Sequence, residues 1–235
     1  MTSPTSARKS FNLFEENDRA TFRCSVSYDI MMDYILKSLR PAKVEGMLTL
    51  VLHPSIRQEN DEKRLTVSEG VYAQGGSPLV GEIVDGKTVE FFVSAVERRE
   101  SVKSALRLLG YSDKSQRALM DMLIRRGYTP EVAKEATEEA IRLGYLNERR
   151  AVEHAVVYMV EHKHYGARRI IPALVSKGYA KPLVHEVISS LVEAGEIDFQ
   201  DAFKALLLKK RVHEIENTEE RKEKIKKLAY QYGFK

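Results

Sequence analysis

Three clusters of neighbouring basic residues are the part of this sequence best suited to chemistry: Arg125-Arg126, Arg168-Arg169 and Lys209-Lys210-Arg211. Such side chains can neutralise the phosphates of a nucleic acid or the acidic surface of a protein. Arg125 and Arg126 close an expected helix, where the helix dipole alone favours cations. Arg168 and Arg169 open an expected helix, where the dipole gives no such explanation. We therefore expect the second pair to make the main contact with a partner.

Tyrosines near the ends of expected helices are a second group that could bind a ligand. Their rings could stack on nucleic-acid bases, and they stand at Tyr128, Tyr145, Tyr165 and Tyr179. Helix-closing aromatic residues in repeats serve more often as core packing. We expect packing at three of these positions and keep Tyr165 as a candidate for partner contact.

The sequence contains no arrangement that catalysis requires, whether Ser/His/Asp, Cys/His or paired carboxylates. We expect no enzyme activity and no cofactor. His154, His162 and His164 are close in sequence, but the last two are two residues apart and do not share a helix face. No acid or thiol completes a metal site with them, so we expect no metal ion. The lone Cys24 can form no intrachain disulfide, which suits a reducing cytoplasm.

The composition is that of a soluble globular protein, with an excess of positive charge in the C-terminal part. No apolar run approaches the roughly 18 residues of a membrane span, and the N-terminus lacks the apolar stretch of a secretory signal. Residues 1–100 carry 13 Lys+Arg against 15 Asp+Glu, a balance of −2, and residues 101–235 carry 25 against 19, a balance of +6. We expect a cytoplasmic protein whose basic part suits a nucleic-acid or nucleoprotein partner, although a solvated helical surface has the same pattern.

An internal repeat organises the helices that must position these side chains. The segment Leu123–Leu146 returns as Leu174–Ile197, and Gly127 recurs as Gly178 at an interval of 51 residues (178 − 127). A third, partial copy of the repeat lies at the end of the sequence, with Gly233 in the corresponding place. Self-similarity at a fixed period indicates an array of units that bury their apolar faces together. A period near 51 leaves room for three helices in each unit.

Residues typical of helix starts and helix ends predict eight helices in this region, in two complete units and one partial unit. The units are residues 97–146, 147–197 and 198–235. Their helices are Ser101–Leu109, Asp113–Arg126, Pro130–Leu143, Glu148–Lys163, Ala167–Lys177, Lys181–Ala194, Phe199–Val212 and Thr218–Tyr232. Thr129 and Asn217 are expected N-caps. Glycines such as Gly178 are expected just beyond helix ends, at the left-handed C′ position.

The N-terminal part is expected to be a small α+β domain over residues 21–96, after a mobile tail over residues 1–20. Alternating patterns at residues 21–27 and 47–53 predict strands, and helical spacing at residues 28–39 predicts a helix.

A β-hairpin is the clearest local prediction in this domain, over residues 79–93. Asp85-Gly86 favours a tight type I′ turn, and two β-rich runs flank it, Leu79–Val84 and Lys87–Val93. A strand is predicted just before it, at Leu65–Ala73.

On these residues the helical region resembles the RecX family, the bacterial regulators of the RecA recombinase. The resemblance covers about residues 100–235 and rests on motifs in a fixed order. The most specific is the run YGARRIIPALVSKGY, in which Gly166 precedes paired basic residues and Lys177 precedes a glycine. The first unit adds Ala105 and Leu109 in its first helix, followed by a Leu-x-x-x-Gly-aromatic close.

The resemblance implies a mainly α fold, an elongated, curved array of three-helix repeats after the small N-terminal domain. It implies binding and no catalysis. RecX proteins bind in the groove of the RecA filament on single-stranded DNA and restrain strand exchange, ATPase and co-protease activity. Gly166, Arg168, Arg169 and Lys177 would then contribute to the contact. We expect a monomer that binds no membrane.

Two other functions stay open. One is a direct DNA-binding protein that uses its three-helix units as helix-turn-helix modules. The other is a helical adaptor whose partner is unrelated to recombination.

Overall fold

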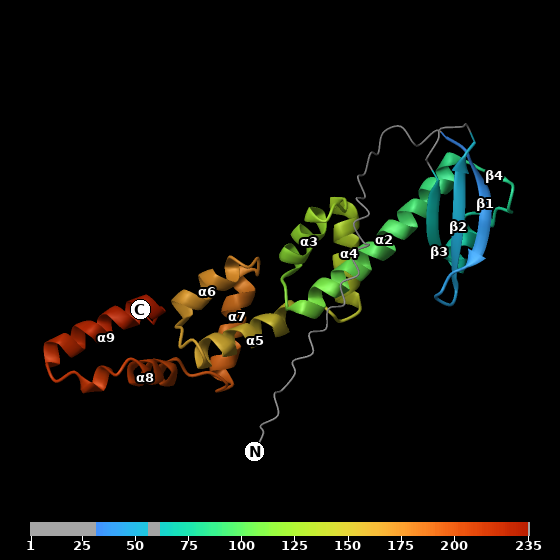
Figure 1. The fold of residues 1–235 in the computed structure, drawn as a ribbon. Helices are drawn as coiled ribbons and strands as arrows, with labels where there is room; N and C mark the ends of the chain where they lie inside the picture. Colours follow the sequence, from blue (N-terminus) through green and yellow to red (C-terminus); the bar gives the residue numbers. More distant parts are fainter. Residues whose placement is uncertain (1–31, 56–61, 235) are drawn as a thin grey trace, which may run out of the picture.

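The computed structural model describes residues 32–55 and 62–234 and shows an elongated molecule (Figure 1). A small sheet forms one end, the last two helices form the other, and the two complete helical units lie between them in sequence order. The mainly α fold predicted from the sequence, an elongated and curved row of helical units after a small α+β domain, is confirmed. The predicted tail at residues 1–20 and strand at residues 21–27 lie outside the described residues.

Four antiparallel strands form the sheet, in the order β3-β2-β1-β4. β1 spans Tyr34–Pro41, β2 Met47–Pro54, β3 Lys63–Ser68 and β4 Ile83–Val84. β2 confirms the strand predicted at residues 47–53. The helix predicted over residues 28–39 is wrong in its described part, because β1 buries Tyr34 and Leu36 on one face with the period of two that a strand requires.

The hairpin predicted over residues 79–93 is wrong, because its second half is helical. Only the two residues of β4 are extended, and α2 follows at Gly86–Tyr111. The Asp85 carboxylate accepts hydrogen bonds from the backbone N–H groups of Lys87 (2.9 Å) and Thr88 (3.0 Å). The Thr88 hydroxyl donates to the same carboxylate (2.7 Å) and holds the pKa of Asp85 below its ordinary value. Asp85 is therefore a helix N-cap and not a turn residue.

The strand predicted at Leu65–Ala73 is confirmed only in its first half. β3 ends at Ser68, and a short helix, α1, follows at Glu69–Gln74. The Ser68 hydroxyl accepts a hydrogen bond from the backbone N–H of Val71 (3.2 Å) and so caps α1.

Helix α2 belongs to two hydrophobic cores. Near its start, Val89 and Phe92 are buried against the sheet. Near its end, Ala105 and Leu108 are buried in the core of the first three-helix unit. The boundary predicted between residues 96 and 97 therefore falls inside a continuous helix, since the first helix predicted for this unit, at Ser101–Leu109, is the last part of α2.

The other predicted helices are present, with ends that differ by a few residues. They are α3 Gln116–Arg125, α4 Pro130–Arg142, α5 Glu148–Glu161, α6 Ala167–Val175, α7 Lys181–Glu193, α8 Phe199–Lys209 and α9 Thr218–Tyr232. A 3-10 turn at Val212–Glu214 follows α8, which ends three residues earlier than predicted. No helix within the described ranges is long and apolar enough to cross a bilayer.

The repeat interval predicts which side chains are buried in successive units. Leu119 and Leu123 of α3 are fully buried, and so are Ile170 and Leu174 of α6, 51 residues later. The glycines predicted to end the helices all have positive φ angles, as the C′ position requires. The predicted N-cap Thr129 accepts a hydrogen bond from the backbone N–H of Val132 (3.3 Å).

Candidate functional site

The first and second units meet where α3 begins and α6 ends. The buried Ser115 caps α3 by accepting from the backbone N–H of Ala118 (3.1 Å), and its hydroxyl donates to the carbonyl of Lys177 (2.8 Å). Gly178 follows with a φ of +92°, and a Cβ there would lie 2.6 Å from the Ser115 hydroxyl. We call this contact the first joint. It requires glycine at 178 because φ is positive there and because a Cβ would overlap the Ser115 hydroxyl that joins the two units.

The second and third units meet in the same way, at the second joint. Gly166 stands 51 residues after Ser115 (166 − 115) and caps α6. Its backbone N–H donates to the carbonyl of Tyr232 (2.8 Å), and the N–H of Arg168 donates to the carbonyl of Gly233 (3.1 Å). A Cβ on Gly233, whose φ is +84°, would lie 2.5 Å from the backbone nitrogen of Arg169. Successive units are therefore joined by one repeated geometry.

Replacing Ser115 by alanine is expected to lower the free energy of unfolding by about 1–3 kcal/mol, because one hydroxyl supplies both the α3 cap and the bond between units. Urea denaturation measures the change. Asn147→Ala is the matched control, because Asn147 caps α5 by accepting from the backbone N–H of Arg150 (3.0 Å), a hydrogen bond within its own unit. Ser115→Ala should cost more than the control, and an equal cost would contradict a role of Ser115 in the joint.

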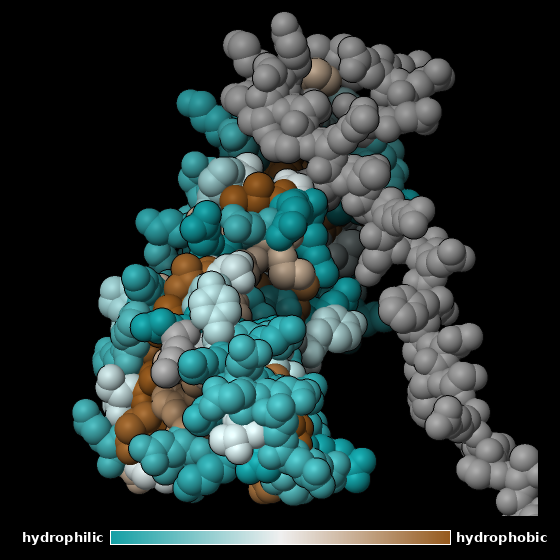
Figure 2. All heavy atoms as spheres, turned by 90° about the vertical axis from the view of Figure 1, so that its left-hand side faces the viewer, coloured by the Kyte–Doolittle hydropathy of each residue, from teal (hydrophilic) through white to brown (hydrophobic). Residues whose placement is uncertain are grey.

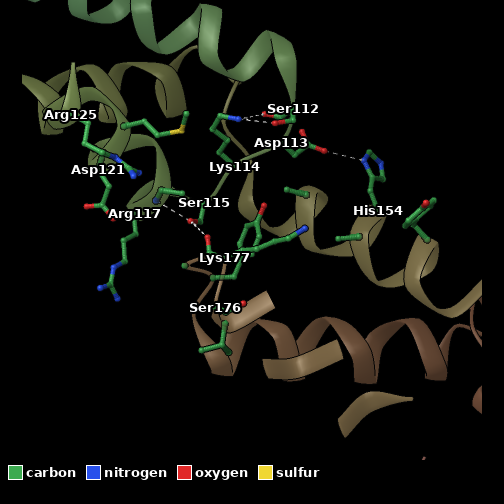
Figure 3. Close-up of a pocket in the computed structure, with 18 residues that line it drawn as sticks. Ser112, Asp113, Lys114, Ser115, Arg117, Asp121, Arg125, His154, Ser176 and Lys177 are labelled. Carbon is green, nitrogen blue, oxygen red and sulfur yellow. Dashed lines mark hydrogen bonds and ion pairs between the residues drawn. The ribbon is translucent and has the colours of Figure 1, made fainter. Parts of the chain in front are cut away.

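A groove of about 820 Å³ opens beside the first joint (Figure 3). Its charged lining contains more cations than acids: Lys114, Arg117, Arg125 and Lys177 against Asp113 and Asp121. Asp113 faces His154 at 3.8 Å, an ion pair when the imidazole is protonated. Burial raises the pKa of Tyr179, which also lines the groove, to about 12, so its phenol stays neutral. The groove is therefore a partly apolar cavity with a positive rim.

The second joint is closed by side chains of the chain itself. The guanidinium of Arg169 lies 4.2 Å from the ring centre of Tyr165 and 5.5 Å from that of Tyr232. It also donates to the carbonyl of Gln231 (2.6 Å). Arg169 and Tyr165, both predicted to contact a partner, are thus occupied in holding α9 against α6, and Gly166 is part of the same contact.

The remaining predicted residues do not form one surface. Arg168 is exposed beside the second joint, whereas Arg125 and Lys177 line the groove at the first. Arg126 donates to the Ser104 hydroxyl (2.6 Å). Lys210 lies 5.8 Å from the ring centre of Tyr232.

Two further cations lie near the end of α8. Arg211 pairs with Glu214 at 2.9 Å. The charge of Lys209 acts on His164, whose pKa it helps to lower.

Arg117 is a candidate that the sequence reasoning missed. It precedes Arg168 by 51 residues (168 − 117), so the two arginines occupy the same place in successive units. Both are exposed. In Figure 3 the Arg117 guanidinium extends away from His154 and Lys177, at the outer edge of the groove. The repeat interval applied to Arg168 would have found it.

The burial of the tyrosines agrees only in part with the prediction. Tyr179 is buried, as expected, but Tyr145 was expected to pack and is 60% exposed. It follows Gly144 just beyond the end of α4.

The end of the molecule formed by α8 and α9 is mainly hydrophilic, with apolar patches between the polar side chains (Figure 2). The lysines of α9 are exposed there: Lys222, Lys224, Lys226 and Lys227. Lys222 pairs with Glu219 at 2.9 Å. This helix has the alternating charges of a solvated surface.

His164 makes stability depend on pH. Its φ is +53°, and its Nδ1 is buried without a hydrogen-bond partner among the described residues. Burial, followed by the positive charge of Lys209, lowers its pKa from the ordinary 6.5. The unfolded chain therefore binds the proton more readily than the folded one. The contribution of neutral His164 is present above pH 6.5 and is lost as the pH falls through the lowered pKa.

His164→Asn tests this, because asparagine tolerates the left-handed backbone. The free energy of unfolding of the wild type should fall relative to that of the variant as the pH is lowered from about 7.5 to 5. Urea denaturation at several pH values measures the difference. A difference that does not change with pH would contradict the assignment.

Comparisons with known proteins bear on the helical part and on the fold. Residues 103–139 match the family described as RecX, first three-helix domain. The regulatory protein RecX of Caldanaerobacter subterraneus subsp. tengcongensis is 25% identical over 157 residues, which cover 66% of this chain and 74% of that protein. A crystal structure of regulatory protein RecX has a TM-score of 0.64 at 16% identity, over 86% of this chain and 95% of that one. RecX from Lactobacillus salivarius has a TM-score of 0.51 at 19% identity, over 59% of this chain and 89% of that one.

Proposed function

The chain belongs to the RecX family of regulatory proteins in its sequence and in its fold, and from this premise we propose that it binds the RecA recombinase and inhibits it. The target is the RecA filament on single-stranded DNA. The protein acts as a cytoplasmic monomer, by binding and not by catalysis. Its effect is to restrain the recombinase, ATPase and co-protease activities of the filament.

The observation that carries this proposal is the repetition of an exposed arginine. Arg117 and Arg168 stand 51 residues apart, in the same place on successive units. Within the described ranges neither side chain forms an ion pair or a hydrogen bond. A filament repeats the same surface from protomer to protomer, so a row of units with a repeated cation can engage several protomers at once. Each added contact is then intramolecular, which raises the overall affinity.

Several contacts along one chain also explain how binding becomes inhibition. A molecule held at successive protomers occupies the groove that partner DNA must enter. It also bridges protomers that must otherwise separate or add during filament growth. Arg117, Arg125, Arg168 and Lys177 are the side chains proposed for the contact, while Arg169 and Gly166 hold the units in place.

The test is the single-stranded-DNA-dependent ATPase of RecA, with this protein titrated in. Inhibition at far fewer than one molecule per RecA protomer is the expected result, because one bound molecule affects its neighbours in the filament. No change in rate at excess protein would overturn the proposal. Steeply salt-dependent binding to naked DNA, without any effect on RecA, would instead support the DNA-binding alternative.

A further inference from the structure

The groove at the first joint is open because small and apolar residues line it where the second joint is filled. Its apolar lining includes Ala118, Met122, Ala151, Ala155 and Val175. At about 820 Å³ the groove lies within the range of cavities that hold a ligand. A groove of this size has room for side chains of another molecule.

The second joint shows which side chains can fill the space beside such a contact. There the rings of Tyr165 and Tyr232 meet edge to face, with their centres 6.0 Å apart, and the Arg169 guanidinium packs against both. The repeat interval places Ala118 at the position of Arg169 and Lys114 at the position of Tyr165, each 51 residues earlier. Lys177, before the glycine of its unit, corresponds to Tyr232. At these positions the first joint therefore lacks both rings and the arginine packed against them, and carries two lysines and an alanine instead.

We propose that the groove binds an acidic peptide segment of the partner protein that carries an aromatic or leucine side chain between its carboxylates. This inference rests on the proposed function and gives the chemistry of the segment that is recognised. The apolar side chain enters beside Ala118, in the space that Arg169 fills at the second joint. The carboxylates pair with Arg117, Arg125 and Lys177 at the rim.

The charges favour a peptide over a nucleic acid. Asp113 and Asp121 stand among the cations of the lining, and they would repel the closely spaced phosphates of a nucleic-acid backbone. A peptide carries fewer charges, spaced along a chain that also has N–H groups to donate to these two carboxylates. The apolar lining is complementary to a side chain. Charge and apolar surface together therefore select an acidic peptide with one apolar anchor.

Fluorescence anisotropy of the full chain with a labelled peptide, Glu-Asp-Phe-Glu-Asp-Leu-Glu-Asp, tests the inference. Two control peptides separate its parts: one has Gln and Asn in place of the acids, and the other has Ala in place of Phe and Leu. The acidic, aromatic peptide should bind at least ten times more tightly than either control. Equal binding of the three peptides, or no binding of the first, would overturn the inference.

Two variants locate the site. Ala118→Arg places at the first joint the residue that fills the second, and Lys177→Glu reverses a charge on an exposed side chain that the fold does not require. Each should weaken peptide binding at least tenfold. Lys226→Glu makes the same charge change on exposed α9 and should leave binding unchanged. Unchanged binding by both groove variants would overturn the site, even if the peptide binds elsewhere.

Two further measurements separate this inference from its alternatives and from the proposed function. If oligo-dT of 16 nucleotides binds more tightly than the peptide and the same variants weaken it, the ligand is a nucleic acid and the inference is wrong. If the protein inhibits the RecA ATPase but does not bind the peptide, the inference fails and the proposed function stands. If it binds the peptide in the groove but leaves RecA unaffected, the proposed function fails and the groove remains a peptide site.

Discussion

An alanine in place of Gly166 is expected to destabilise the attachment of the third unit by about 2–5 kcal/mol, through overpacking and the loss of two backbone hydrogen bonds. A Cβ at this position would overlap the carbonyl group of Gly233 and lie 2.7 Å from the backbone nitrogen of Phe234. Because backbone atoms and not flexible side chains are in the way, α9 has to move away. The bonds from Gly166 and Arg168 to Tyr232 and Gly233 are then broken.

Amide hydrogen exchange measures this change residue by residue. Faster exchange is expected at Gly166, at Arg168 and along α9, with little change in the sheet. Gly110→Ala is the matched control. Gly110 lies within α2 with nothing inside 4 Å of an added Cβ, so alanine should raise stability there by about 0.5–1 kcal/mol. Unchanged protection of α9 in Gly166→Ala would show that the second joint does not hold the third unit.

Reversing the charge of Arg117 and Arg168 together is expected to raise the concentration needed to inhibit the RecA ATPase by about 10–100-fold, as loss of paired charges at two linked contacts implies. Each single change to glutamate should have a smaller effect, because the other unit still binds. Both side chains are exposed, so the fold should be retained. The measurement is the titration of ATPase rate for the single and double variants.

Arg107→Glu with Lys226→Glu makes the same total charge change at two other exposed positions, in the first and third units. This control should inhibit like the wild type. If it weakens inhibition as much as the change at Arg117 and Arg168, the effect comes from net charge alone. The repeated arginines would then have no specific role.

The adjacent pair Arg168 and Arg169 shows where sequence reasoning stops. Both open α6, and their residue type marks both as candidates for an anionic partner. In the structure Arg168 is exposed, while Arg169 donates to the carbonyl of Gln231 and packs against two tyrosine rings. The contact between α6 and α9 joins residues more than 60 positions apart, and no local pattern of apolar or charged residues specifies it.

The helical repeat could be predicted because its signals are local and occur more than once. Glycine after α3 and α4 returns after α6 and α7 at the same interval as the buried apolar side chains of these helices, and each occurrence supports the others. The joints could not be predicted in this way, although they repeat too. Ser115 and Gly166 share a position but not a residue type, because one closes its contact with a hydroxyl and the other with backbone alone.

The N-terminal domain was less predictable because the same residues suit two structures. Asp85-Gly86 has the composition of a tight hairpin turn and also that of a helix start. The residues after it, from Lys87 to Val93, are rich in β-branched and aromatic side chains that favour a strand. They form a helix because Val89 and Phe92 are buried against the sheet. Tertiary packing outweighs local propensity here.

Because α2 belongs to two hydrophobic cores, its length also sets the distance between those cores. α2 has 26 residues and therefore spans about 39 Å at the 1.5 Å rise of an α-helix. The sheet and the first unit cannot slide along it or swing about a linker, since Phe92 anchors one end and Leu108 the other. The helix therefore fixes the distance between the sheet and the first unit. Any partner that touches both the sheet and the first unit must present its two binding surfaces at the separation that this helix sets.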